Sequence, residues 1–243
     1  MPLLPTHLNQ KNPVGWNDST SVSQYLVGPY QNFNYIILDQ QTHQAAIVDP
    51  QIEIEPLLSD LKQHNYQLKQ IWLTHTHYDH VGGLQKLYHQ FKDLQLYLHS
   101  KEYHRIEHLN LPKKNRFFFN DNESFSLGQL EIKTSHTPGH TAGALCFQWK
   151  HNDHHFLLSG DTLFLGNCGR TDLPTGNVGE LFNSLSRIKT WNPNLIVLCG
   201  HHYSNKVAEF LGNEIQTNPA LLCKNVEELT LYRLKRDQLR NDK

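Results

Sequence analysis

The sequence predicts two mixed β-sheets that pack face to face, with helices on their outer sides. Three observations support this fold class. Strand and helix patterns alternate in the first half of the chain, the second half repeats that succession, and no linker or low-complexity tract separates the halves. A chain of 243 residues is also near the largest size that one hydrophobic core fills. We therefore expect a single domain over 1–243, with a short helical tail from about residue 220.

In the first half, apolar runs bounded by turn-forming residues predict strands, and apolar residues at helical spacing predict helices. In chain order we expect a hairpin of strands 35–38 and 45–48, a helix over 53–65, a buried strand 70–74, a helix opened by Gly82-Gly83, and a strand 94–98. The strand 70–74 runs straight into a cluster of histidines. That cluster is therefore expected at the C-terminal edge of a strand.

A less regular stretch over 101–120 separates this half from the next. There we expect strands 130–133, 144–149 and 155–159, a helix over 178–188, a strand 195–199, and helices over 206–215 and 226–239. The chain after Pro219 is highly charged and is expected to pack along one side of the domain.

Charge and composition limit the classes of partner. The formal net charge of −1 provides no basic field for nucleic acid, and no apolar window approaches the ~20 residues of a membrane span. The segment from Met1 to His7 lacks the features of an export signal. The four cysteines form no Cys-x-x-Cys pair, which favours reduced thiols: Cys146, Cys168, Cys199 and Cys223. We expect a cytoplasmic protein, monomeric or homodimeric, that acts on a small molecule.

The most informative motif is the segment His75-Thr76-His77-Tyr78-Asp79-His80, which places three imidazoles and one carboxylate within six positions. Imidazole nitrogen and carboxylate oxygen are ligands that zinc and iron prefer. Four such groups so close together along the chain predict a metal site.

Three later segments share one design, because each places a candidate ligand directly after a glycine: Gly139-His140, Gly160-Asp161 and Gly200-His201. Two cations about 3.5 to 4 Å apart need three ligands each and one shared carboxylate, and Asp161 is the natural bridge. The predicted metal ligands are His75, His77, Asp79, His80, His140, Asp161 and His201. Asp79 and Asp161 are the candidate catalytic residues.

The residues of these motifs resemble those of the metallo-β-lactamase superfamily, and the resemblance extends over nearly the whole chain. It implies an α+β fold, a four-layer αββα sandwich. It also implies one metal ion held by His75, His77 and His140, a second held by Asp79, His80 and His201, and Asp161 as the bridge. Within the superfamily, four blocks are similar to the glyoxalase II branch of thiolester hydrolases: 46–50, 160–164, 168–170 and 200–203.

The chain departs from glyoxalase II in two places. After Cys168-Gly169 it continues as Arg170-Thr171-Asp172-Leu173-Pro174, which is closer to persulfide dioxygenases and to smaller glyoxalase II-like hydrolases. The long helical C-terminal domain of the larger enzymes is truncated. Glutathione as the thiol carrier is consequently less firmly implied than the reaction type.

The predicted reaction is hydrolysis of a thiolester, an S-acylglutathione such as S-lactoylglutathione, by a metal-bridging hydroxide. The thiol leaving group has a pKa of ~8.5 and can depart as thiolate without a dedicated acid. Two divalent ions are the expected cofactors, with zinc favoured over iron. Arg170 is the candidate partner of a substrate carboxylate and Tyr203 the candidate hydroxyl donor, while Trp72 and Phe164 are expected to wall the site.

Rival functions use the same residues. A mononuclear ferrous persulfide dioxygenase would use His75, His140 and Asp161 only. Two features favour hydrolysis: Thr162-Leu163-Phe164 follows the aspartate, and Gly200-His201 late in the chain keeps a complete second site. The motifs are also compatible with a lactonase or β-lactamase activity on the same metal pair, and with a non-enzymatic metal-buffering role.

Overall fold

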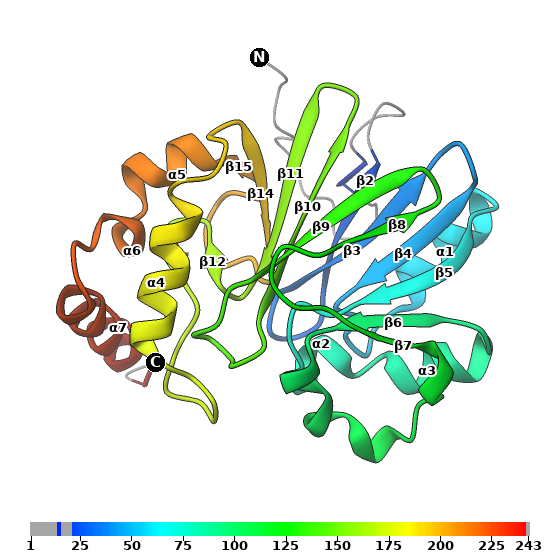
Figure 1. Cartoon of the computed structure of the whole chain (residues 1–243), viewed down its shortest axis with the longest axis horizontal. Coiled ribbons are helices and arrows are strands. Elements are labelled where there is room, and N and C mark those ends of the chain that lie inside the picture. Colours follow the sequence, from blue (N-terminus) through cyan, green and yellow to red (C-terminus); the bar gives the residue numbers. More distant parts are fainter. Residues whose placement is uncertain (1–13, 16–20, 242–243) are drawn as a thin grey trace.

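The computed structural model describes residues 14–15 and 21–241 and consists of two β-sheets packed face to face between layers of helices (Figure 1). Helices α1 (Glu55–Gln63) and α3 (Leu84–Gln90) lie outside the first sheet. The outer side of the second sheet is covered by α4 (Val178–Ile188), α5 (Leu211–Thr217), α6 (Pro219–Leu222) and α7 (Val226–Asn241). The four layers confirm the predicted αββα sandwich.

The first sheet has the strand order β1-β2-β3-β4-β5-β6-β7 among the described residues. Its strands are β1 (Val14–Gly15), β2 (Val22–Val27), β3 (Asn32–Asp39), β4 (Gln44–Val48), β5 (Gln67–Trp72), β6 (Gln95–Leu98) and β7 (Arg116–Phe118). Strands β2 to β4 are antiparallel, and β4 to β7 are parallel. The pairing of β3 with β4 confirms the predicted hairpin.

The second sheet has the order β15-β14-β11-β10-β9-β8 in the described chain. Its strands are β8 (Ser124–Leu127), β9 (Leu130–His136), β10 (Leu145–His151), β11 (His154–Gly160), β14 (Leu195–Cys199) and β15 (Glu209–Phe210). Strands β11 and β14 run parallel, and the other neighbours are antiparallel. Between β11 and α4, the short strands β12 (Leu163–Phe164) and β13 (Asn167–Cys168) form a separate ribbon.

The first sheet is buried on both faces, because its central strands β3 and β4 are mostly apolar and are buried at nearly every position. Successive side chains of a strand point to opposite faces. In β3, Tyr35 and Ile37 pack into the core between the sheets, whereas Ile36 packs into the core beneath the helices, with Leu57 of α1 and Leu84 of α3. A continuous apolar run is therefore the correct pattern for these strands.

The predicted helix over 206–215 is wrong in its first half. Residues Glu209–Phe210 form β15, whose Phe210 pairs with Ile196 of β14, and α5 begins only at Leu211. The apolar residues here suit an extended edge as well as a helix, because Val207 and Ala208 are both buried. The free edge of β14 decides between the two by supplying backbone hydrogen-bond partners.

Several elements have no counterpart in the predictions. Strands β2, β7 and β8 were not expected, and the less regular stretch contains η1 (Ser100–Arg105), η2 (Glu107–Leu109) and η3 (Lys113–Asn115). These segments are short, and their apolar residues do not recur at one clear period. A further short helix, α2 (Tyr78–Val81), lies inside the histidine cluster.

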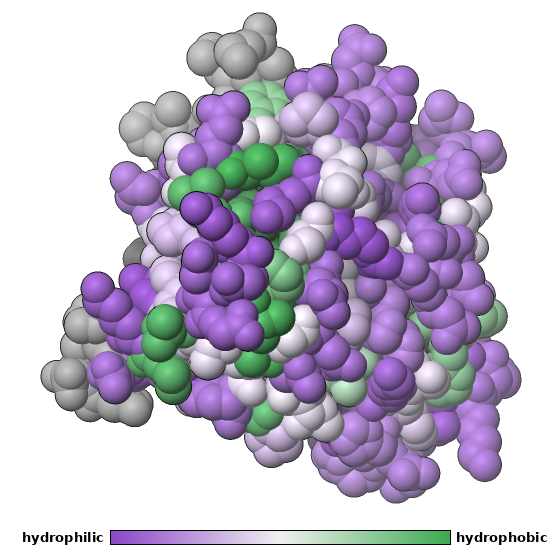
Figure 2. Space-filling view, turned by 60° about the vertical axis from the view of Figure 1, so that its left-hand side comes forward, coloured by the Kyte–Doolittle hydropathy of each residue, from purple (hydrophilic) through white to green (hydrophobic). Residues whose placement is uncertain are grey.

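The charged C-terminal segment forms α7, which packs beside α4 and buries Leu229 and Arg233. Leu231 and Leu234 on the same helix remain exposed. The surface seen in Figure 2 is mainly hydrophilic, with hydrophobic groups in separate small patches. Among the described residues, no helix is both long and apolar enough to cross a membrane. The segment Met1 to His7 and the expected domain limits, residues 1 and 243, lie outside the described residues.

Candidate metal centre

The seven predicted ligands lie on four loops that meet at one edge of the sandwich. His75 and His77 follow β5, and α2 carries Asp79 and His80. The remaining three come from elsewhere in the chain: His140 from the loop between β9 and β10, Asp161 from the end of β11, and His201 from the end of β14. Strand ends from both sheets thus bring together side chains that are up to 126 residues apart in the sequence.

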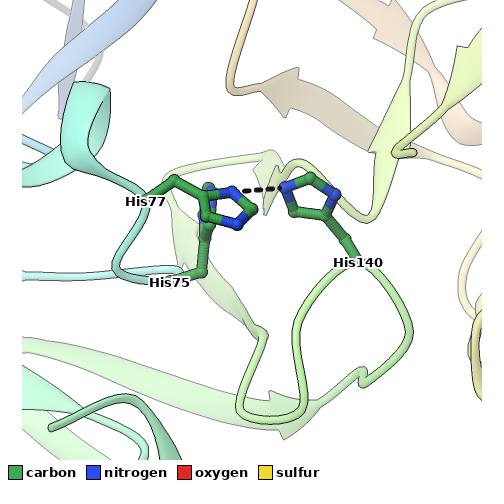
Figure 3. A group of neighbouring side chains, drawn as sticks. All are labelled: His75, His77 and His140. Carbon is green, nitrogen blue, oxygen red and sulfur yellow. Dashed lines mark hydrogen bonds between the residues drawn. The ribbon is translucent and has the colours of Figure 1, made fainter. Parts of the chain in front are cut away.

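His75, His77 and His140 form one group whose ligand nitrogens lie within 4.8 Å of one another. Figure 3 shows the ring of His77 facing that of His140 from the opposite loop. Nδ1 of His77 lies 3.0 Å from Nε2 of His140. This spacing is close to the roughly 3.3 Å between two nitrogens of a tetrahedral zinc ion at about 2.0–2.1 Å from each.

Asp79, His80 and His201 form a second group of the same kind. Nε2 of His80 lies 3.1 Å from Nε2 of His201, and Oδ2 of Asp79 lies 3.5 Å from the latter atom. Asn32 donates its side-chain amide to Asp79 Oδ2 at 3.1 Å. The three ligand atoms therefore converge from α2 and from the end of β14.

Asp161 lies between the two groups. Its Oδ2 is 3.4 Å from Nε2 of His140 in the first group and 3.3 Å from Nε2 of His201 in the second. Its Oδ1 is 3.6 Å from Nε2 of His80 and has no hydrogen-bond partner. This is the position that a carboxylate shared by two cations needs.

The donor set fits a pair of metal ions. Nε2 of His75 and Oδ1 of Asp161 are buried without a hydrogen-bond partner, which is costly for polar atoms that lack a cation or donor. In four histidines the opposite ring nitrogen is occupied, so that Nε2 is left free for a cation. His140 donates from Nδ1 to the Arg170 carbonyl at 2.7 Å, and His201 donates to the Tyr30 carbonyl at 2.8 Å.

Asp49 orients His75 and His80, the other two of these four histidines. It was not predicted as a site residue. Its carboxylate accepts the Thr74 hydroxyl at 2.6 Å and the Thr74 backbone N–H at 2.8 Å, and it accepts Nδ1–H of His80 at 3.1 Å. Because the Thr74 hydroxyl donates to Asp49, its oxygen accepts Nδ1–H of His75, 3.1 Å away. Asp49 directly follows β4, and its place at a strand end was the available signal.

Burial and charge set the protonation of the site. Burial lowers the pKa values of His75, His77 and His140, that of His77 to about 4, so these rings are neutral near pH 7, as metal binding requires. Burial opposes ionisation of Asp161, but His201 and His80 outweigh it and hold the pKa of Asp161 well below its usual value. Burial also disfavours the charged form of His80, yet the carboxylates of Asp161, Asp49 and Asp79 raise its pKa to about 10. Metal binding at His80 would therefore release a proton.

The glycine before each later ligand allows close packing of the loops. A Cβ on Gly200 would lie 2.1 Å from Asp161 Oδ1. Gly139 has a φ of +137°, and a Cβ there would lie 2.3 Å from the backbone of Leu181 in α4. Only glycine fits at these two positions.

The predicted substrate contacts lie beside the centre. Tyr203 is 46% exposed and stacks on His201, with ring centroids 4.8 Å apart. The Arg170 guanidinium binds Asp172 through two hydrogen bonds of 2.6 and 2.5 Å, while its backbone carbonyl holds His140. Phe164 packs against His201 and Tyr203, in the position expected for an apolar wall.

One expectation near the site is wrong. Trp72 does not wall the metal centre, because it is fully buried between the sheets against Phe125 and Phe147.

Cys168 follows the candidate bridge in the sequence, but it is buried like the other cysteines, and burial raises the pKa of its thiol to about 12. It is a buried neutral thiol rather than a reactive one.

The family model for the metallo-beta-lactamase superfamily matches residues 28–201. A probable polyketide biosynthesis zinc-dependent hydrolase of Bacillus velezensis is 31% identical over 213 residues, which cover 86% of this chain and 90% of that protein. The hydroxyacylglutathione hydrolase of Pelagibacter ubique is 31% identical over 194 residues, 79% of this chain and 76% of that protein.

Among solved structures, TTHA1623 in a di-iron-bound form is 29% identical to this chain. Its TM-score is 0.66, and the match covers 81% of this chain and 98% of that one. The family match confirms the resemblance predicted from the motifs, and the hydroxyacylglutathione hydrolase agrees with the predicted branch. The chain therefore belongs to the metallo-beta-lactamase superfamily.

Proposed function

We propose that the protein hydrolyses a thiolester, an S-acylglutathione such as S-lactoylglutathione, at a centre of two divalent metal ions. The observation that carries the proposal is the place of Asp161, whose Oδ2 lies 3.4 and 3.3 Å from ligand nitrogens of the two groups. The first ion would be held by His75, His77 and His140. The second would be held by Asp79, His80 and His201, with Asp161 shared.

Two divalent ions supply Lewis-acid polarisation of the acyl carbonyl and strongly lower the pKa of water. The chain's own residues supply orientation and charge. Asp79 and Asp161 bring two carboxylates to the centre, where His75 and His140 are buried. Zinc is the favoured ion, which agrees with the zinc-dependent hydrolase relative, and iron is the alternative, which agrees with the di-iron form of TTHA1623.

A thiolester suits this site better than an amide. The thiol leaving group has a pKa of ~8.5 and departs as thiolate, so no protonating side chain is needed opposite the metal ions. The relative named hydroxyacylglutathione hydrolase supports an S-acylglutathione as substrate. Arg170, which is partly exposed, would bind a substrate carboxylate, and the exposed Tyr203 would donate its hydroxyl.

The mononuclear persulfide dioxygenase is disfavoured by the second ligand group. A single ferrous ion held by His75, His140 and Asp161 would leave Asp79, His80 and His201 without a function. Those three residues nevertheless converge to within 4.8 Å. Two imidazoles and a carboxylate that converge in this way form a ligand set that suits a second divalent cation.

The test combines metal analysis of the purified protein with hydrolysis of S-lactoylglutathione. Two metal ions per chain with hydrolysis that chelation abolishes would support the proposal. Asp161→Asn should lose the activity, whereas His89→Asn, which changes an exposed histidine on α3, should keep it. One iron per chain with oxygen uptake on glutathione persulfide and no hydrolysis would refute the proposal.

A further inference from the structure

Glu102 is a buried carboxylate in η1, the stretch for which no regular structure was predicted. It is 1% exposed. Its Oε2 accepts hydrogen bonds from the backbone N–H of Thr76 at 2.9 Å and from the Thr76 hydroxyl at 2.7 Å. Its Oε1 accepts a hydrogen bond from the backbone N–H of Gly143 at 3.0 Å. One side chain thus binds two separate loops.

These two loops carry all three members of the first ligand group. Thr76 lies between His75 and His77, and Gly143 lies three residues after His140. His77 and His140 are 63 residues apart along the chain, so their ring nitrogens meet only if the two loops keep a fixed relative position. A backbone bond from Leu145 N–H to the Thr74 carbonyl, 2.8 Å long, also joins the loops, but at their bases.

The surroundings of Glu102 favour an ionised carboxylate at this position. Burial disfavours the charged form, but the bonds from Thr76 and other neighbours outweigh it and lower the pKa of Glu102, so the group is ionised near pH 7. Hydrogen bonds to an ionised acceptor are about twice as strong as neutral ones. Gly143 permits the approach, because a Cβ there would lie 2.8 Å from Cγ and 2.9 Å from Oε1 of Glu102.

The second ligand group depends on other contacts. His80 is held by Asp49, His201 by the Tyr30 carbonyl, and Asp79 by Asn32. Glu102 makes none of these bonds. From this difference we infer that Glu102 is a positioning residue, which sets the metal affinity of the His75, His77 and His140 group and affects that of the second group much less. The inference rests on the metal centre of the proposed function, although not on its substrate.

The main test is Glu102→Gln, which preserves the size of the side chain. Its amide NH2 must face the N–H of either Thr76 or Gly143, so one loop loses its acceptor and meets a donor. Loss of such outer contacts lowers metal affinity by about 10–100-fold. We expect a loss in this range at the first group and a clearly smaller loss at the second, which Glu102 reaches only through the shared Asp161.

The readout is zinc titration of the metal-free full-length protein, followed by calorimetry and by imidazole nitrogen NMR. Shifts of His77 and His140 report the first group, and shifts of His80 and His201 report the second. Gly143→Ala reaches the same contact from the opposite loop and should weaken zinc binding at the same group. Agreement between the two variants would show that the contact matters rather than either residue alone.

Asp39→Asn is the matched control. Asp39 is also a buried, ionised carboxylate that joins two turns, because it accepts the Thr42 hydroxyl at 2.5 Å and the Gln129 backbone N–H at 2.9 Å. It lies at the end of β3 and β4 opposite to Asp49. Its loss should lower the melting temperature without changing zinc affinity at either group.

Equal losses at both groups in Glu102→Gln, no loss at either, or the same loss in Asp39→Asn would overturn the inference. A wild-type protein that binds neither zinc nor ferrous iron would refute the inference and the proposed function together. A wild-type protein that binds two zinc ions but does not hydrolyse thiolesters would refute only the proposed function, and the selective loss in Glu102→Gln would then still support the positioning role.

Discussion

Arg170 acts at the candidate centre through two different parts of the residue. Its backbone carbonyl holds His140, and its guanidinium is paired with Asp172. Arg170→Ala keeps the carbonyl and removes the guanidinium. If the guanidinium binds a substrate carboxylate, KM for S-lactoylglutathione should rise about tenfold or more, with a much smaller change in kcat. Steady-state kinetics measure both constants.

Asp172→Asn is the matched comparison for that experiment. It removes the charge that competes for the guanidinium, so KM should fall or stay constant. An unchanged KM in Arg170→Ala would remove Arg170 from the substrate site and leave only its backbone role.

His99 is a titratable residue that is neutral in the folded protein near pH 7. Burial lowers its pKa to about 4 from the ordinary 6.5, and its ring stacks on that of His136 at 4.3 Å. Between pH 6.5 and 4 the unfolded chain therefore binds more protons at His99 than the folded chain does. Stability should fall as the pH falls through this window.

The corresponding prediction is that His99→Gln loses less stability than the wild type between pH 6.5 and 4. After allowance for solvent screening, the difference should be about 1 kcal/mol. Urea denaturation at a series of pH values measures it, and His89→Gln serves as the exposed control. Parallel pH profiles for wild type and His99→Gln would contradict the prediction.

At the scale of elements, α7 supports the loop that carries Arg170. Arg233 of α7 donates from Nη1 to the Cys168 carbonyl at 3.1 Å, and the Tyr232 hydroxyl donates to Asn167 Oδ1 at 2.8 Å. The same loop accepts Nδ1–H of His140 two residues later. The C-terminal helix is therefore linked to a metal ligand through one short segment.

Arg233→Met should loosen this segment. We expect hydrogen exchange over 167–172 to accelerate by about tenfold, and kcat/KM to fall by a similar factor, because a buried hydrogen bond to the loop is lost. Lys235→Met on the exposed side of α7 should change neither quantity. Equal exchange rates in the two variants would contradict a supporting role for the helix.

Elements with a strong internal pattern were predicted well. The helix over 178–188 and the strand 195–199 coincide with α4 and β14, since each has a clear apolar period and defined ends. The predicted helix over 206–215 failed because pairing with β14 outweighed local preference. The short helix η1, which carries Glu102, was not predicted. Glu102 is held by a hydrogen bond to a loop 26 residues away, and a contact of that kind produces no periodic pattern in the local sequence.

At the scale of the whole molecule, the candidate centre joins the two sheets, because its ligands follow β5 in the first sheet and β9, β11 and β14 in the second. Each metal ion that binds only the folded state stabilises it by about 2.7 kcal/mol when the free ion is at 100 times its Kd. Two such ions contribute about 5.4 kcal/mol, which in a chain of 243 residues corresponds to a shift of about 11–22 °C in Tm.

Removal of metal by a chelator should therefore lower Tm by that amount, and addition of zinc should restore it. Calorimetry before and after chelation measures the shift, and magnesium, which prefers oxygen ligands, should fail to restore it. A Tm that does not change when elemental analysis shows complete removal of metal would exclude a centre that links the two sheets.

The sequence by itself determined the kinds of side chain at the candidate centre and the alternation of strands and helices around them. Both are local properties: histidines and aspartates are clustered or follow glycines, and apolar residues recur with the period of an element. The seven candidate ligands could be named for this reason.

Only the tertiary structure decided which residues hold those ligands in place. Asp49, Glu102 and the Tyr30 and Arg170 carbonyls act through hydrogen bonds between segments that are distant in the chain. The same reason removed Trp72 from the centre, since a ligand, His75, follows it three residues later in the chain but its neighbours in space are aromatic residues of the core. Contacts of this kind depend on how the two sheets pack, and no local pattern encodes that packing.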